Sequence, residues 1–321
     1  MRKVGIMSMQ RIANYGSFLQ AYALKQLIEE VGCNVEFVDY HVGAPVITEN
    51  ADSKNKVIRK IKKGLETFRY RAPLAHKLSF IRYKQSFAQK YMPLLGIADE
   101  MNYNPTVDCL VIGSDEVFNC IQKNSNVGYS PELFGKNNHA KKLITYAASF
   151  GNTTLEKLEK YKKANEVGAL LKKFDAISVR DANSGTIVEQ LTGKEPVYNL
   201  DPVLTYDYMN CCDKIPQVQT NEKYLILYAY ADRISNDEAD WIAAYAKKKN
   251  LNVYAIGGIQ KCADRFVDCS PFEVLAYFRN AEEVITDTFH GSIFSAITHR
   301  PFTTLIRKSV GNLSLIHISE P

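Results

Sequence analysis

The chain has 321 residues, of which 46% are hydrophobic and 23% are charged. This composition is that of a globular protein, it excludes a disordered or fibrous chain, and the length allows two domains of usual size. No apolar run is long enough to cross a bilayer, and the N-terminal MRKVGIMSM leads into a strand without a signal-peptide pattern. We therefore expect a cytoplasmic protein. Seven cysteines without CxxC or metal-ligand spacing predict reduced, mostly buried thiols and no metal site.

The net charge of +5 is unevenly distributed. Residues 54–90 hold twelve Lys or Arg against one acid, Glu66, so this segment contributes +11 and the rest of the chain −6. Apolar residues recur among these cations at helical spacing, namely Val57, Ile58, Ile61, Leu65 and Phe68. The segment is either a solvated basic helix or an amphipathic helix that makes peripheral contact with the inner face of an anionic membrane. No nucleic-acid recognition motif accompanies the charge, so we expect no nucleic-acid partner.

Strands and helices alternate from the start of the chain. The pattern predicts strands over 3–9 and 34–40 around a helix that is closed by Gly32, and then a basic helical insertion at about 50–95. Further strands are predicted over 107–114, 142–149 and 174–180, with helices near 154–173 and 182–192, and PVYNL (196–200) then leads to Asp201 and Pro202. Strands separated by helices of this length indicate a parallel sheet covered on both faces. Residues 1–205 are thus expected to form an N-terminal Rossmann-like domain.

A polar stretch from about Thr205 to Glu222 resembles a linker, and a second series follows it. Strands are predicted over 223–230, 251–258 and 282–286, and helices over 236–250 and 270–281, with Ser270 as cap of the second. We expect residues 222–313 to form a C-terminal Rossmann-like domain. The predicted fold class is α/β, with two doubly wound domains facing a cleft, and ligands of such sheets bind beyond the carboxyl ends of the strands.

Polar side chains follow four of these strands. Asn14 and Gly16 precede the first helix, Ser114 and Asp115 follow strand 107–114, Arg180 follows strand 174–180, and His290 lies where strand 282–286 meets a helix. A helix N-terminus presents backbone N–H groups and a positive dipole to an anion. No turn carries the G-x-G-x-x-G or Walker pattern, so a tightly bound dinucleotide or nucleoside triphosphate is not expected.

Each candidate also has a structural interpretation. Asp115 could cap the segment after Gly113, and Arg180 could form a surface ion pair with Asp181. His290 could be a packing histidine, but Gly291 beside it would let a ligand approach the backbone. His299 lies near a helix end, where a role in satisfying the last carbonyls is expected.

Five segments together resemble the polysaccharide pyruvyl transferase family. They are NYGSFLQAYAL, DCLVIGSDEVFN, ISVRDANS, LDPVL and VITDTFHGSIFSAITHRPF, and in this order they span most of residues 3–306. The resemblance implies a fold similar to GT-B glycosyltransferases and an enzyme that moves the pyruvyl group of phosphoenolpyruvate onto two hydroxyls of one sugar as a ketal. It also implies that Asp115, Arg180 and His290 are the active-site residues.

The chemistry of these residues suits that reaction. Phosphoenolpyruvate carries a phosphate and a carboxylate, which require cations and backbone donors, and ketal formation requires proton transfer. We assign His290 as acid and phosphate ligand, Arg180 as anion clamp and Asp115 as the base for the sugar hydroxyls. The expected substrate-binding residues are Asn14, Gly16, Ser114, Gly291 and Ser292. No cofactor is expected beyond phosphoenolpyruvate as donor, and the acceptor is a sugar or glycan, free or lipid-linked.

Two features depart from the family pattern. Some members have Arg two residues before the histidine, where this chain has Thr288, so a second phosphate cation has to come from elsewhere, with Arg307 or Lys308 as candidates. Residues 314–321 resemble translated sequencing adapter, and we expect them to be a non-native tail after a C-terminal domain that is incomplete.

A GT-B-type glycosyltransferase that uses a nucleotide sugar is the alternative. It would share the cleft and need an acidic ribose-binding residue in the second domain, for which Asp264 and Asp268 are the candidates. A non-catalytic binding protein with this fold would lack Asp115, Arg180 or His290, and all three are present.

Overall fold

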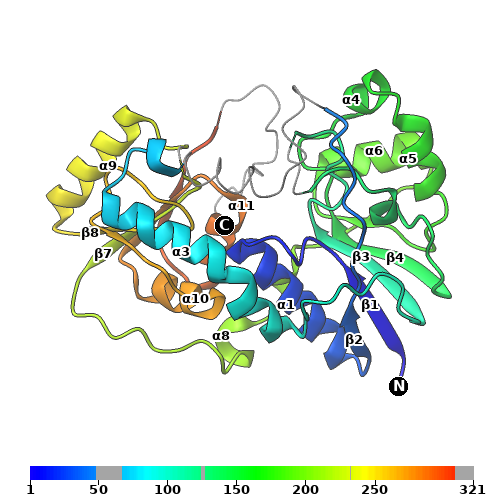
Figure 1. Ribbon diagram of the computed structural model, residues 1–321, viewed down its shortest axis with the longest axis horizontal. Coiled ribbons are helices and arrows are strands. Elements are labelled where there is room, and N and C mark those ends of the chain that lie inside the picture. The colour runs from blue at the N-terminus through cyan, green and yellow to red at the C-terminus, as the bar shows by residue number, and fades with distance from the viewer. Residues whose placement is uncertain (48–66, 124–126, 232, 308–321) are drawn as a thin grey trace.

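Two parallel β-sheets form the two halves of the computed structural model, which describes residues 1–47, 67–123, 127–231 and 233–307 (Figure 1). The first sheet has the strand order β2-β1-β3-β4-β5-β6. Its strands are β1 (Lys3–Met7), β2 (Asn34–Phe37), β3 (Cys109–Asp115), β4 (Lys142–Ala148), β5 (Ser178–Val179) and β6 (Val197–Tyr198). All neighbouring strands are parallel, and β3 in the middle is buried along almost its whole length. The predicted parallel sheet is confirmed.

The second sheet has the order β11-β10-β7-β8-β9, again with every pair parallel. Its strands are β7 (Tyr224–Tyr228), β8 (Asn252–Ile256), β9 (Arg265–Phe266), β10 (Glu283–Thr286) and β11 (Phe302–Thr304). β7 is fully buried, as a central strand with both faces covered should be. The predicted fold class, two Rossmann-like α/β units, is therefore confirmed. The expectation of an incomplete C-terminal domain and a non-native tail concerns residues that are mostly outside the described part of the chain.

The helices that cover the sheets begin and end largely where the cap residues predict. They are α1 (Tyr15–Glu30), α4 (Leu155–Lys160), α5 (Ala164–Leu171), α6 (Ala182–Thr192), α7 (Pro202–Thr205), α8 (Tyr208–Cys211), α9 (Asn236–Lys249), α10 (Pro271–Asn280) and α11 (Phe289–Ile297). The single helix predicted near 154–173 is wrong: it is α4 and α5, separated by Lys162 in the left-handed region with φ 57°. Ser270 caps α10 with a full capping box.

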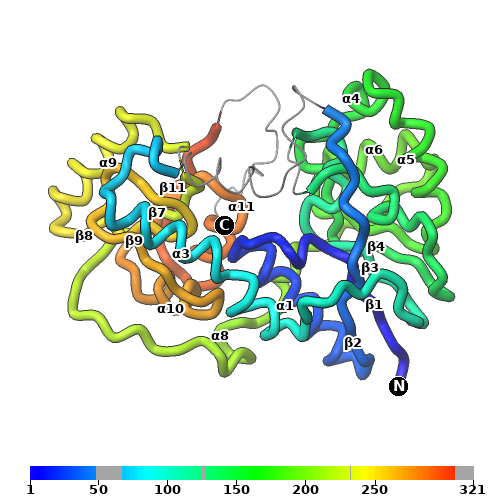
Figure 2. The backbone as a smooth tube through the Cα atoms, viewed as in Figure 1, coloured from blue at the N-terminus to red at the C-terminus, as the bar shows by residue number. Residues whose placement is uncertain are grey.

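Helix α1 lies between the two halves and joins them (Figure 2). Phe18 and Tyr22 of α1 make edge-to-face contacts with Phe272 of α10, and the Tyr15 hydroxyl donates to the Cys269 carbonyl at 2.8 Å. One apolar core runs from β1 through α1 to β7 and β8. The halves are therefore packed together at the base, and the polar site lies above this apolar contact.

The basic insertion is described from residue 67 onward, and there it forms α3 (Leu74–Tyr91), followed by the 3₁₀ turn η1 (Met92–Leu95). Phe80 and Tyr83 of α3 contact Phe266 of the second sheet, and Tyr83 also contacts Tyr15 of α1. The insertion assigned by sequence to the N-terminal domain thus packs against both halves. Its predicted apolar positions from Val57 to Leu65 are outside the described residues. No helix in the described ranges is long and apolar enough to cross a membrane.

Candidate active site

The carboxyl ends of both sheets open into one cavity of about 460 Å³. It is lined by Met9, Ile12, Asn14, Ser17, Asp115, Glu116, Asn119, Gln122, Lys123, Val127, Asn152, Arg180, Tyr228, Tyr230, Arg233, Asp287, Thr288, Phe289, His290 and Arg307. Residues from the two halves therefore meet at the position that doubly wound sheets use for ligands. The predicted catalytic residues Asp115, Arg180 and His290 are all in this lining.

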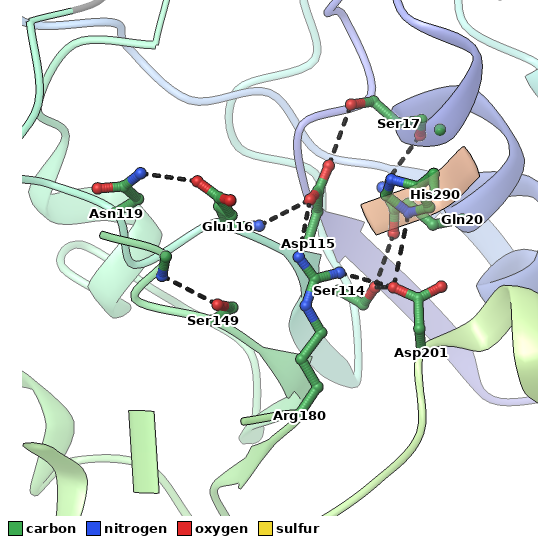
Figure 3. Close-up of polar contacts among 12 residues, drawn as sticks. Ser17, Gln20, Ser114, Asp115, Glu116, Asn119, Ser149, Arg180, Asp201 and His290 are labelled. Carbon is green, nitrogen blue, oxygen red and sulfur yellow. Dashed lines mark hydrogen bonds and ion pairs between the residues drawn. The ribbon is translucent and has the colours of Figure 1, made fainter. Parts of the chain in front are cut away.

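Arg180, directly after β5, is held between two carboxylates (Figure 3). Its Nη1 donates to Asp201 Oδ2 at 2.6 Å and its Nη2 to Asp115 Oδ1 at 3.2 Å, and its side chain is only 7% exposed. Burial alone would lower the pKa of Arg180, but Asp201, Asp115 and Glu116 raise it. The guanidinium therefore stays charged in a buried position.

Asp181, which the sequence offered as an ion-pair partner for Arg180, caps a helix instead. Its carboxylate accepts from the Ser184 N–H at 2.8 Å and caps α6. The interpretation of Arg180 as part of a surface ion pair with Asp181 is wrong, because the guanidinium points into the site and the carboxylate points to the helix.

Asp115 ends β3 with its backbone in the left-handed region at φ 77°. This conformation is uncommon for a residue other than glycine and costs of order 1–3 kcal/mol, and such positions concentrate at functional sites. The carboxylate accepts from Arg180, from the Ser17 hydroxyl at 3.0 Å and from the Glu116 N–H at 2.9 Å. Asp115 does more than cap the segment after Gly113, because it connects β5 and α1 across the cavity.

His290 is the second residue of α11, and Thr288 is the cap of that helix, with its Oγ1 accepting from the Gly291 N–H at 3.0 Å. The ring is 13% exposed, and its Nε2 lies 3.7 Å from Asp201 Oδ2. Thr288 therefore begins the helix that carries His290. The first turn of such a helix presents backbone N–H groups to an anion in the cavity.

Two arginines of the second half enter the cavity around one buried carboxylate. Asp287 follows β10, and its Oδ2 lies 3.4 Å from Arg233 Nε and 3.3 Å from Arg307 Nε. Burial raises the pKa of Asp287, although both guanidinium groups oppose the rise. Arg307, which the sequence offered as a candidate for a second cation, lines the cavity, and so does Arg233. Lys308 is outside the described residues.

The predicted substrate-binding residues divide into two groups. Asn14 lines the cavity and donates to the Tyr230 hydroxyl at 2.9 Å, and Gly16 packs directly against the His290 ring. Ser114, Gly291 and Ser292 lie behind the lining. Ser114 donates to Gln20 at 3.1 Å, and the Ser292 hydroxyl contacts Thr304 at 2.8 Å.

Close packing against two threonines explains the glycine at position 291. A Cβ at this position would lie 2.1 Å from Thr286 Oγ1 and 2.8 Å from Thr288 Oγ1. The space that was expected to admit a ligand is therefore occupied by two threonine hydroxyls.

Sequence reasoning missed several residues of the site. Asp201, Glu116, Arg233 and Asp287 were not predicted, although Asp201 belongs to the LDPVL segment and Asp287 follows a predicted strand directly. Burial alone would raise the pKa of Asp201, but His290, Arg180 and the Val203 N–H together lower it to about 2. Burial and the neighbouring Asp115 raise the pKa of Glu116.

The described residues contain no group of three or more His, Cys, Asp or Glu side chains arranged to hold a metal ion. Cations and carboxylates are instead paired with one another around the cavity. The fold and the site thus define a doubly wound α/β protein with paired cations and carboxylates at the carboxyl ends of two sheets, where proteins of this class bind their ligands.

Comparison with known families is more specific, because residues 14–309 match the polysaccharide pyruvyl transferase family, and the chain belongs to that family. No curated protein sequence matches the chain.

Similar solved structures include three proteins, each 10% identical in sequence. One is MnaA of S. aureus in a co-structure with UDP, with a TM-score of 0.48 and a match that covers 95% of this chain and 79% of that chain. Another is UDP-GlcNAc 2-epimerase of Methanocaldococcus jannaschii in complex with UDP-GlcNAc and UDP, with a TM-score of 0.47 and coverage of 95% and 84%. The third is UDP-N-acetylglucosamine 2-epimerase of Rickettsia bellii, with a TM-score of 0.48 and coverage of 94% and 78%.

Proposed function

We propose that this member of the polysaccharide pyruvyl transferase family uses phosphoenolpyruvate as donor and forms a pyruvate ketal on one sugar of a cell-surface polysaccharide or its lipid-linked precursor. One observation carries the proposal: His290, three arginines and the carboxylates of both halves converge on a single cavity. Its volume lies in the range of ordinary small-molecule sites, about 300–1,000 Å³. That range accommodates a three-carbon dianion together with a sugar ring.

The reaction can be written with the residues present. A proton is added to the methylene carbon of the enolpyruvyl group, which becomes a methyl group. The oxygen of a first sugar hydroxyl bonds to the neighbouring carbon, and the proton that it loses replaces the one that was donated. A second hydroxyl of the same sugar then takes the place of the phosphate, and its proton leaves with the phosphate. The net products are a cyclic ketal and inorganic phosphate, so no cofactor is required.

The geometry supports the following roles for residues of the site. His290 at the start of α11 donates the first proton, and the arginines Arg233 and Arg307 bind the phosphate and carboxylate with the helix N-terminus. Arg180, expected from the sequence to clamp the anion, instead holds the carboxylates of Asp115 and Asp201 in place. Asp115, which Arg180 and Ser17 hold in place, accepts the proton of the second sugar hydroxyl and passes it to the departing phosphate.

A pair of histidine variants tests this function. The wild-type protein should release phosphate from phosphoenolpyruvate only with an acceptor glycan present, and NMR should show the ketal methyl group. His290→Asn should lower the rate by about 10²–10⁴-fold, the usual contribution of a general acid. His299→Asn is the matched control, because His299 is exposed at the end of α11. Unchanged turnover in His290→Asn would remove His290 from the mechanism.

The alternative, a glycosyltransferase that uses a nucleotide sugar, has less support. The carboxylate of Asp264 accepts from the Val253 N–H at 2.7 Å, and neither Asp264 nor Asp268 lines the cavity. A ligand that binds only the native state raises the melting temperature. Phosphoenolpyruvate is therefore expected to raise it, whereas a rise with UDP-sugars alone would favour the alternative.

A second cavity, of about 450 Å³, supports an acceptor larger than one sugar. It shares Arg233 with the first cavity and is lined further by Tyr70, Arg71, Ile234, Ser235, Asn236, Ala239, Ile259, Gln260 and Lys261. Its described lining has three cations, of which Lys261 is paired with Asp240 at 2.7 Å, and no carboxylate. A glycan that carries phosphate beyond the reacting sugar would fit this charge. Lys261→Ala should then raise the KM for a phosphorylated acceptor and leave the KM for a neutral one unchanged.

Peripheral membrane contact also has a structural basis in α3. Phe80, Tyr83 and Phe87 bury the inner face of this helix, but Leu74 and Leu78, one turn apart, are 62% and 55% exposed. Exposed leucines next to basic residues are typical of an interfacial helix. Replacing both leucines with serine should weaken binding to vesicles that contain anionic lipid. Leu200→Ser, also at an exposed position, is the control.

A further inference from the structure

The two nitrogens of the His290 ring have different surroundings. Nε2 is buried, has no hydrogen-bond partner within the described part of the chain, and points toward Asp201 Oδ2 at 3.7 Å. The Nδ1 side lies against Gly16, where a Cβ would be only 2.4 Å from Nδ1. Because His290 lines the cavity while Nε2 is buried, Nδ1 is the ring nitrogen available to a ligand.

Asp201 is fixed in place from several directions. Its side chain is fully buried, Oδ2 accepts from Arg180 Nη1 at 2.6 Å, and Oδ1 accepts from the Val203 N–H at 3.0 Å at the start of α7. The Ser114 hydroxyl lies 3.5 Å from Oδ2. The lowered pKa of Asp201 agrees with a carboxylate that stays ionised. A fixed charge at this point can orient a neighbouring ring.

We propose that Asp201 is a positioning residue that holds Nε2 of His290, while Gly16 leaves the space that Nδ1 needs, so that Nδ1 exchanges the proton with the substrate. The inference rests on the proposed function for the identity of that substrate. The 3.7 Å separation is longer than a hydrogen bond, and such contacts commonly shorten in the substrate complex.

This arrangement determines which ring nitrogen of His290 carries a hydrogen. In the neutral ring, Nε2 carries the hydrogen and faces Asp201, and Nδ1 holds a lone pair toward the cavity. In the charged ring, Nδ1 also carries a hydrogen. That proton goes to the methylene carbon of the enolpyruvyl group, whose double-bond electrons form the new C–H bond. The ring then recovers the proton of the first sugar hydroxyl, whose oxygen bonds to the neighbouring carbon.

NMR of protein labelled with ¹⁵N-histidine tests the positioning directly, with no substrate present. The neutral His290 ring of the wild type should carry its hydrogen on Nε2. In Asp201→Asn the amide group can donate to Nε2, so the hydrogen should move to Nδ1, and kcat should fall by at least about 10²-fold with less change in the KM for phosphoenolpyruvate. A wild-type ring with its neutral hydrogen on Nδ1 would overturn the proposal.

Gly16→Ala tests the same idea if Asp201→Asn fails to fold. The added methyl group must displace the ring, so kcat should fall although the contact between Asp201 and Arg180 is intact. Gly168→Ala, in the middle of α5 and remote from the cavity, is the control. A folded Gly16→Ala protein with wild-type kcat would contradict the proposal. Wild-type turnover with phosphoenolpyruvate tests the proposed reaction separately.

Discussion

The two halves of the cavity are built differently. In the N-terminal half, Arg180 lies between Asp115 and Asp201, and the three side chains satisfy one another. In the C-terminal half, Asp287 Oδ1 and Arg307 Nη2 are buried without a hydrogen-bond partner within the described residues. Buried polar atoms are normally paired, so unpaired ones require an explanation. The charged side chains of the first half are thus paired with one another, whereas the second half keeps polar atoms that no described residue pairs.

The largest difference between the halves should be in stability. Arg180→Met leaves Asp201 buried without its guanidinium partner, and breaking a buried pair typically costs 3–5 kcal/mol. Arg233→Met should cost under about 1 kcal/mol, because its side chain is 33% exposed and Asp287 keeps Arg307. Urea unfolding of both variants measures the contrast. Equal losses would show that the first half is no more tightly organised than the second.

The second half should instead determine affinity for the donor. Arg307→Gln removes a charged donor whose Nη2 has no partner in the described part of the protein, and hydrogen bonds to charged groups are worth about 1.5–3 kcal/mol. The KM for phosphoenolpyruvate should therefore rise about 10- to 100-fold, with a smaller effect on kcat. Arg279→Gln, which loses only an exposed bond to the Pro216 carbonyl, is the control. A KM that does not change would assign the phosphate to other cations.

The sequence predicts the strands and helices of both halves better than it predicts which side chains pair in the cavity. Alternating strands and helices and the cap at Ser270 depend on local patterns, and these predictions were confirmed. The break between α4 and α5 was missed because Lys162 adopts a left-handed conformation that its residue type does not indicate. Local signals were sufficient where local chemistry decides the structure.

Pairing across the cavity depends on tertiary structure. Arg180 and Asp181 are adjacent in sequence, yet Arg180 pairs with Asp201, because strand direction and the cap of α6 point the two side chains apart. Arg233, Asp287 and Arg307 come together because β10 lies between β7 and β11 in the sheet. Residue order could place each side chain at the edge of a sheet but could not show which partner it meets.

The contacts of Asp201 with His290 and Arg180 should also make the stability of the fold sensitive to acid. The pKa of Asp201 is about 2 in the folded protein, against about 3.9 for an ordinary aspartate. A carboxyl group whose pKa is lower in the folded than in the unfolded protein stabilises the fold at pH values above its unfolded pKa. This contribution is lost as the pH falls from about 4 towards 2. It should amount to about 2 kcal/mol. The free energy of unfolding in urea, measured between pH 5 and pH 2.5, reports this loss. The Asp201→Asn variant should lack this part of the pH dependence.

The smallest expected effect has the opposite sign and comes from Glu116, beside Asp115. Burial and the charge of Asp115 raise the pKa of Glu116, so its ionised form destabilises the fold at neutral pH. Glu116→Gln keeps an acceptor for the Asn119 amide, which now donates to Glu116 Oε2 at 2.7 Å.

The variant should match the wild type below about pH 4, where the carboxyl is protonated in both states, and should become more stable than the wild type as the pH rises. Melting temperatures from pH 4 to pH 8 measure the difference. A variant that loses stability at pH 7 would show that the cations of the site, and Arg180 above all, offset the burial of this second carboxylate. The charges of the N-terminal half would then balance as one network that includes Glu116, and not only through the pairs that Arg180 forms with Asp115 and Asp201.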